Sequence, residues 1–359
     1  MDITSHFSPS QGLTIISTSG SQKYPDKLDS YSSITTSIRC SIFNKNNKFC
    51  MDSCWESENI YYANYDTGYV KKVNFSGTEL ASLALTTPYM VSVIQDSSSM
   101  NTVVTYPPQE DKGCWIADAD GTIIKTDNQL NVLYQLSGIT NATGIIADLD
   151  GGCYVAGTYL GSNRLIKLST TATVLATKPY ASFSPAVSNF IEMSLDVSNN
   201  LWFTANDKIY SVRYQNGQII SLLPSPLDPI SLLPPSVEEY HIGGTDVDRN
   251  SLLQYLYVTV GNGLKSYIIK YDQDGTPIAS QLYTDIVYPY IIKVVQGLAS
   301  TSLYILEDSA KWDDYGYGSS SSSSSSSYIE NWSSSSSSSS SSSESSSSES
   351  SSSSSSSET

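Results

Sequence analysis

The sequence predicts an all-β protein, a β-propeller of six four-stranded blades, with five or seven blades as alternatives, followed by a serine-rich, low-complexity tail. Three observations lead to this prediction. A short apolar-aromatic motif recurs six times at blade-sized intervals. No segment keeps a 3.6-residue apolar period, so helices are expected to be minor or absent. The segment 319–359 is almost entirely serine, and it cannot bury enough apolar surface to offset its ordering entropy.

The recurring motif has one or two apolar residues on either side of an aromatic residue. Its six copies begin at Ile60, Cys114, Cys153, Leu201, Leu256 and Leu303, and their aromatic residues are Tyr61, Trp115, Tyr154, Trp202, Tyr257 and Tyr304. The spacing is close to the roughly 40–50 residues of propeller repeats. We therefore expect these aromatic residues to be buried on the innermost strand of each blade.

Most of the first five copies are followed by three further apolar segments. The first of them often contains a Lys, as in Ile123-Ile124-Lys125. In several copies a turn such as Asn216-Gly217 separates this segment from the next one. The last runs into an Asp shortly before the following motif. Four strands joined by short turns make one unit, and a radial array of such units buries both faces of each sheet.

The sixth copy stops after one strand, so its sheet needs strands from elsewhere. The N-terminal region offers apolar segments at residues 12–16 and 33–43. We expect these to complete a composite closing blade, since such closure removes an exposed sheet edge. The chain is accordingly divided into a propeller over residues 1–318 and a tail or linker over residues 319–359.

One copy carries a more specific pattern. Asp148-Leu149-Asp150-Gly151-Gly152 precedes the strand Cys153–Ala156, and Asn163-Arg164 precedes a further apolar strand. This copy resembles the NHL-type repeat and the six-bladed propellers related to it. The resemblance extends over about residues 55–310 and implies the architecture alone, because propellers have many functions.

Composition narrows the classes of function. The formal net charge of −16 disfavours binding to nucleic acid. No apolar run is long enough to span a membrane, and the N-terminus lacks the pattern of a secretory signal. Charged residues are only 15 % of the chain, and the polar surface is rich in Tyr, Ser and Asn. These features favour a non-enzymatic display or assembly module, extracellular or on a virion, that binds glycans, a protein partner or copies of itself without a cofactor.

An alternative is a metal-dependent hydrolase or lyase with its site at the channel mouth. Asp148, Asp196 and Asp246 end successive apolar strands. Six-bladed lactonases, which this chain resembles in architecture, hold a divalent cation such as calcium there. The structural interpretation is that each Asp caps the following loop through backbone N–H groups. The three Asp-x-Asp-Gly sequences lack the Glu of an EF-type calcium loop and are expected to be turns.

Histidine and cysteine add little to the enzyme hypothesis. Only His6 and His241 are present, and we expect His241 to be an exposed loop residue, although it is also the one candidate for the His of a propeller lyase. Cys114 and Cys153 occupy equivalent motif positions and are expected to be buried thiols. The remaining cysteines, Cys40, Cys50 and Cys54, leave a disulfide or part of a metal site open.

Several positions could carry glycans. Asn74, Asn141 and Asn331 match the N-glycosylation sequence. The tail is a candidate O-glycan carrier, at serines such as Ser333, Ser345 and Ser351, or a phosphorylation target. Its one interruption by larger side chains, residues 328–332, is a candidate docking peptide.

Overall fold

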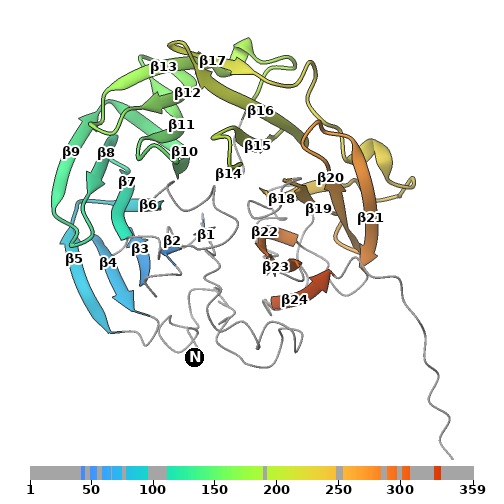
Figure 1. The fold of residues 1–359 in the computed structure, drawn as a ribbon, viewed down its shortest axis with the longest axis horizontal. Coiled ribbons are helices and arrows are strands. Elements are labelled where there is room, and N and C mark those ends of the chain that lie inside the picture. Colours follow the sequence, from blue (N-terminus) through green and yellow to red (C-terminus); the bar gives the residue numbers. More distant parts are fainter. Residues whose placement is uncertain are drawn as a thin grey trace, which may run out of the picture.

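The computed structural model describes residues 42–44, 49–54, 59–65, 67–74, 78–95, 111–188, 192–247, 254–283, 289–296, 301–307 and 327–332. Their strands form six antiparallel sheets arranged around a centre (Figure 1). The predicted all-β propeller class is therefore confirmed. The helical elements among these residues are two single turns of 3-10 helix, η4 (Tyr180–Ser182) and η5 (Ile230–Leu232).

The strands follow one another along the chain within each sheet. The first sheet holds β1 to β5 (Ile42–Asn44, Phe49–Cys54, Asn59–Asn64, Tyr69–Asn74, Glu79–Ala84), and the second holds β6 to β9 (Pro88–Gln95, Asp111–Asp118, Thr122–Thr126, Val132–Ser137). The third holds β10 to β13 (Ile139–Ala147, Cys153–Tyr159, Ser162–Leu168, Val174–Pro179), and the fourth holds β14 to β17 (Met193–Leu195, Leu201–Ala205, Lys208–Gln215, Gln218–Ser221). The fifth holds β18 to β21 (His241–Val247, Leu256–Gly261, Ser266–Tyr271, Pro277–Tyr283), and the sixth holds β22 to β24 (Pro289–Gln296, Thr301–Glu307, Ser327–Trp332).

The recurring motif lies on the second strand of most sheets, which corrects the predicted position by one strand. The strands nearest the centre include β6, β10, β14, β18 and β22, and successive members of this set contact one another from sheet to sheet (Figure 1). Each is the segment that precedes a motif. The turn between that segment and the motif is short in the third sheet, from Asp148 to Gly152, so the two strands pair as a hairpin.

The aromatic residues of the motif are buried as predicted. Tyr61, Trp115, Tyr154, Trp202 and Tyr257 are at most 4 % exposed, and Tyr304 lies on β23, outside the strands whose burial is described. The apolar cores of the sheets merge across their junctions. One cluster extends from β3 through β7 to β11, and two more continue through the fourth and fifth sheets.

A lysine on the strand after the motif faces the aromatic residue in several sheets. The register pairs Tyr61 with Lys72, Trp115 with Lys125, Tyr154 with Lys167, and Tyr257 with Lys270. Each of these ammonium groups lies over the ring that it faces, 5.2–5.5 Å from the ring centroid. We call these residues the aromatic–lysine pairs.

The first two aromatic–lysine pairs reach into the next sheet. Lys72 Nζ lies 2.7 Å from a carboxylate oxygen of Asp111 and donates to the Asn128 carbonyl, while the Tyr61 hydroxyl donates to the same carboxylate at 2.7 Å. Lys125 Nζ donates to the Gly151 carbonyl at 2.8 Å, which the Trp115 indole N–H also approaches at 3.3 Å. Buried polar groups of one sheet are thus satisfied by the next sheet.

The described part of the sixth sheet contains no N-terminal strand of the predicted composite blade. β23 pairs with β22 on one side and with β24 on the other, so both of its edges are occupied. β24 comes from within the segment assigned to the tail. The strand β1 pairs with β2 in the first sheet, and residues 12–16 and 33–41 lie outside the described residues, so the composite blade stays a prediction. The segment that forms β24 contains no proline and has three large apolar or aromatic residues. Such residues favour β-strands, whereas a run of serine does not.

The pairing of β24 with β23 can be tested by a disulfide. Ser302 and Asn331 are direct Cα partners, and such partners lie about 4.5–5.5 Å apart, within the range of a disulfide. We expect the double variant Ser302→Cys/Asn331→Cys to form this bond under mild oxidation, as detected by peptide mapping. The matched control, Ser302→Cys/Ser345→Cys, measures non-specific crosslinking. Equal crosslinking in the two variants would contradict the pairing.

The inter-sheet contact of Lys72 can be tested by removing its partner. Asp111→Ala removes the carboxylate from a buried ammonium group and should cost about 3–5 kcal/mol of unfolding free energy, measured by chemical denaturation. The adjacent Lys71 contacts Glu79 at the same N–O distance of 2.7 Å but at the surface. Glu79→Ala should therefore leave stability unchanged within error. Similar losses in both variants would refute the assignment.

Candidate active site

The junction between the fourth and fifth sheets departs from the repeated pattern. Trp202 on β15 faces Ser211 on β16 rather than a lysine. Its indole N–H turns back to Asp196 of its own sheet at 3.3 Å. Other polar groups connect these two sheets. Departures from an otherwise consistent pattern are where functional residues are expected.

Asp207 lies at this junction on a two-residue turn. Ala205 at the end of β15 pairs with Lys208 at the start of β16, so Asn206 and Asp207 form the hairpin loop. Both have left-handed backbone conformations, with φ of 50° and 53°, as a type I′ turn requires. Asn and Asp tolerate this region better than most residues. The Asn206 amide donates to the Ala186 carbonyl at 2.7 Å, which helps to hold the turn.

The Asp207 carboxylate bonds with the start of β18 in the fifth sheet. One oxygen accepts from the Ile242 backbone N–H at 3.0 Å, and the other lies 3.0 Å from His241 Nδ1. The His241 side chain is only 11 % exposed and that of Asp207 29 %. The predicted placement of His241 in an exposed loop is thus wrong, because the residue begins an inner strand and is covered by the neighbouring sheet.

This geometry favours one tautomer of the imidazole. A carboxylate beside Nδ1 favours the tautomer in which Nδ1–H donates. The Nε2 atom then carries the lone pair, as in a general base oriented by a carboxylate. The backbone N–H of Ile242 holds Asp207 in place. A carboxylate in this position also stabilises the imidazolium when His241 is protonated.

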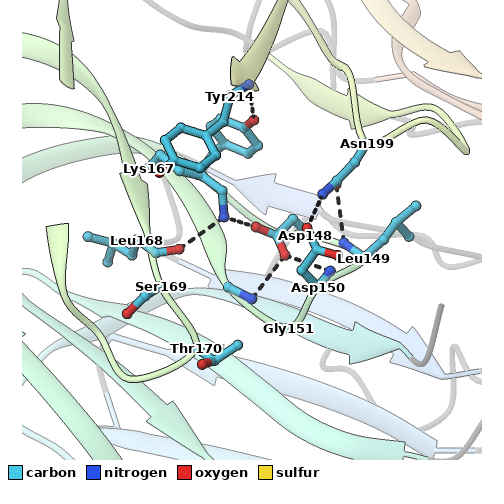
Figure 2. A network of polar contacts seen from close by, with 12 residues as sticks. Asp148, Leu149, Asp150, Gly151, Lys167, Leu168, Ser169, Thr170, Asn199 and Tyr214 are labelled. Atoms are coloured by element: carbon cyan, nitrogen blue, oxygen red, sulfur yellow. Dashed lines mark hydrogen bonds and ion pairs between the residues drawn. The ribbon is translucent and has the colours of Figure 1, made fainter. Parts of the chain in front are cut away.

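The predicted metal ligand Asp148 is fully used by structural contacts (Figure 2). One carboxylate oxygen accepts from the backbone N–H groups of Asp150 and Gly152, both at 2.9 Å. The other contacts the ammonium group of Lys167, and both side chains are buried. A divalent cation at this carboxylate would have to displace the lysine. The neighbouring Asp150 accepts from Asn199 of the fourth sheet at 3.0 Å, so the turn also contacts the next blade.

The other two predicted ligands lie in different sheets. Asp196 accepts from the backbone N–H groups of Ser198 and Asn200 at 2.9 and 2.8 Å, as Asp148 does in its turn. Asp246 lies on β18 opposite Tyr257 and is 6 % exposed. Across the described residues, no three His, Cys, Asp or Glu side chains gather as metal ligands would. The contacts of Asp148 and Asp196 thus disfavour them as ligands of the divalent-cation site of the alternative hypothesis, and the assignment of Asp246 stays a prediction.

The Asp-x-Asp-Gly sequences are turns, as expected. Asp272 accepts from the N–H groups of Asp274 and Thr276, in the same way as Asp148, and the Asp118 carboxylate accepts from Thr87. The glycines that end the sequences, Gly121, Gly151 and Gly275, have φ between 78° and 94°, which explains their identity.

The candidate glycosylation positions are distributed over three sheets and the tail. Asn74 ends β4, and its side-chain oxygen accepts from the Thr78 N–H at 2.8 Å. Asn141 is exposed on β10, and Asn331 lies on β24. Ser333, Ser345 and Ser351 lie outside the described residues, as do His6 and Cys40. Glycosylation at these positions stays a prediction.

Sequence reasoning identified His241 but missed Asp207. The dipeptide Asn206-Asp207 between two apolar strands is a hairpin signal that was available. Its contact with His241 joins residues from two sheets, and no spacing rule along the chain reveals it.

Comparison with known proteins supports the fold and assigns no family. No family model matches, and no curated protein does. Among solved structures, the chain is similar to regucalcin, a calcium-binding protein from Agrobacterium tumefaciens, with 12 % identity, a TM-score of 0.42, and coverage of 78 % of this chain and 87 % of that one. It is similar to a luciferin-regenerating enzyme, with 11 % identity, a TM-score of 0.45, and coverage of 79 % of this chain and 87 % of that one. It is also similar to a gluconolactonase from Xanthomonas campestris, with 11 % identity, a TM-score of 0.43, and coverage of 76 % of this chain and 94 % of that one.

The similar structures include a luciferin-regenerating enzyme and a gluconolactonase, so the expectation of a non-enzymatic display module is withdrawn in favour of the enzymatic alternative. The expectation that the chain is more likely not an enzyme is withdrawn with it. At this level of identity the likeness concerns the fold alone, so the chemistry has to come from the site. The described residues contain no helix with the length and apolar character needed to cross a membrane.

The two buried thiols give a test of the packing around the second and third sheets. Cys114 and Cys153 are free and fully buried, and burial raises the pKa of both thiols. Both should stay protonated and unlabelled by thiol reagents at mildly alkaline pH in the folded protein, and become labelled in denaturant. Peptide mapping separates them from the other three cysteines. Rapid labelling of either thiol in the native state would show that its strand is not packed as described.

Proposed function

We propose that this protein is a hydrolase of esters or lactones in which His241 acts as general base and Asp207 orients it. The observation that carries the proposal is the contact of 3.0 Å between His241 Nδ1 and the Asp207 carboxylate. It lies in the sheet junction next to Trp202, the one buried motif residue of the described sheets that does not face a lysine. Neither His241 nor Asp207 is needed to continue the repeated pattern.

The proposed reaction uses only groups of this chain and water. His241 Nε2 takes a proton from a water molecule as its oxygen attacks the substrate carbonyl. Asp207 stabilises the resulting imidazolium without itself taking the proton. The imidazolium then gives its proton to the departing alkoxide, so that the C–O bond breaks to an alcohol and a carboxylic acid, which ionises in water. The imidazole thereby returns to its starting tautomer.

The pair also has the right electrostatic setting for this role. Its side chains are largely covered, and a low dielectric strengthens the attraction between imidazolium and carboxylate. Asp207 is held by the Ile242 N–H, so little reorganisation is needed when charge develops.

A protein or glycan partner and an extracellular or virion location stay predictions from composition.

The proposal is tested with the full chain and a panel of aryl esters and sugar lactones. We expect hydrolysis of at least one class, and His241→Gln should lower kcat/KM by about 10²–10⁴-fold. Asp207→Asn should lower it as well, because an amide that donates toward Nδ1 selects the wrong tautomer. Circular dichroism and melting curves verify that the variants fold.

His6→Gln is the matched control, since the chain has only these two histidines. It should retain full activity. Lack of hydrolysis throughout the panel, or an active His241→Gln protein, would contradict the proposal.

A further inference from the structure

The outermost strands of the sheets differ in how they protect their free edges. In the first five sheets these are β5, β9, β13, β17 and β21, which lie at the rim of the ring (Figure 1). An outer strand offers a row of backbone N–H and C=O groups to any other strand that approaches it. Proteins commonly block such edges with charge, proline or short length.

Four of these outer strands carry such protection. β5 begins with Glu79, and β13 ends in Lys178 and Pro179. β17 has four residues, and β21 begins with Pro277.

The fifth outer strand, β9, has none of these features. Its sequence is Val-Leu-Tyr-Gln-Leu-Ser over Val132–Ser137, without charge or proline. Val132, Leu133 and Tyr134 are 46, 48 and 43 % exposed, so apolar side chains project on both faces of the strand. Within the described residues β9 pairs only with β8. An uncharged six-residue edge of this composition is suited to pairing with another strand.

The charge distribution indicates what that strand is. The chain carries a formal charge of −16, so two copies repel each other over most of their surface. Residues 128–147, which include β9, contain no Asp, Glu, Lys, Arg or His. Two copies that approach edge to edge at β9 therefore oppose no charged side chains of this segment, and charges beyond about 8–10 Å are screened at physiological salt.

We propose that β9 pairs antiparallel with β9 of a second copy and joins two propellers into a dimer about a two-fold axis. In such a pair directly opposed side chains share a face, so an axis normal to the sheet relates one residue to the same residue of the second copy. Centring on Tyr134 opposes the two tyrosines and places Leu133 opposite Gln135 of the second copy. It also gives the aromatic cross-strand pair that stabilises such ladders.

The oligomeric state of the full chain tests the proposal. Sedimentation velocity over the micromolar range should show a concentration-dependent dimer for the wild-type protein. Tyr134→Lys places two ammonium groups opposite each other and should raise the dimer dissociation constant at least ~10-fold. Tyr134→Glu should do the same. An equimolar mixture of the two variants should recover the dimer, because the introduced ammonium group of one copy then faces the introduced carboxylate of the other.

Leu80→Lys on β5 is the matched control, since Leu80 is as exposed as Leu133. It should dimerise like the wild-type protein. A monomeric wild-type protein throughout the range, or undiminished dimerisation of Tyr134→Lys, would overturn the proposal. Equal loss in Leu80→Lys, or failure of the mixture to recover the dimer, would overturn it as well.

Discussion

A lysine buried against an aromatic ring needs a partner, and in the first two aromatic–lysine pairs the partner is supplied across a sheet junction. Lys72 and Lys125 direct their ammonium groups to a carboxylate and to carbonyls of the following sheet. The Tyr154 hydroxyl likewise accepts from the Tyr214 N–H of the next sheet at 3.0 Å. Because a buried ammonium group without a partner is costly, each of these sheets depends on its neighbour in a defined register. These directional bonds add to the register that apolar packing across the junctions already favours.

The candidate site follows from the interruption of this pattern. With Ser211 in the position of the lysine, the fourth sheet contacts the fifth through Asp207 and the N–H of Ile242. That arrangement places an imidazole beside a carboxylate without any further change to the repeat. A site on rigid hairpins and inner strands keeps its geometry better than one on long loops. Asp148 and Asp196 are by contrast assigned a structural role, since their carboxylate oxygens accept hydrogen bonds that hold turns.

The repeat itself was predictable from local pattern. The aromatic residues Tyr61, Trp115, Tyr154, Trp202 and Tyr257 are buried, and the strands and turns around them follow from alternating apolar residues and Asp-Gly turns. The position of the motif strand within each sheet could not be predicted, because a periodic sequence does not reveal where each sheet begins. The strand β24 was not predicted, because its segment was assigned to the tail and its pairing with β23 depends on contacts between residues distant in sequence. Asp207 was missed because its role exists only across a sheet junction.

The central claim is that Asp207 holds His241 with its proton on Nδ1. Long-range ¹H–¹⁵N correlation spectra of the imidazole rings test this most directly, and comparison with His6→Gln assigns the two signals. The account predicts that neutral His241 is the Nδ1–H tautomer in the wild-type protein and loses this preference in Asp207→Asn. An Nε2–H tautomer in the wild-type protein, or a spectrum of His241 unaffected by Asp207→Asn, would contradict it.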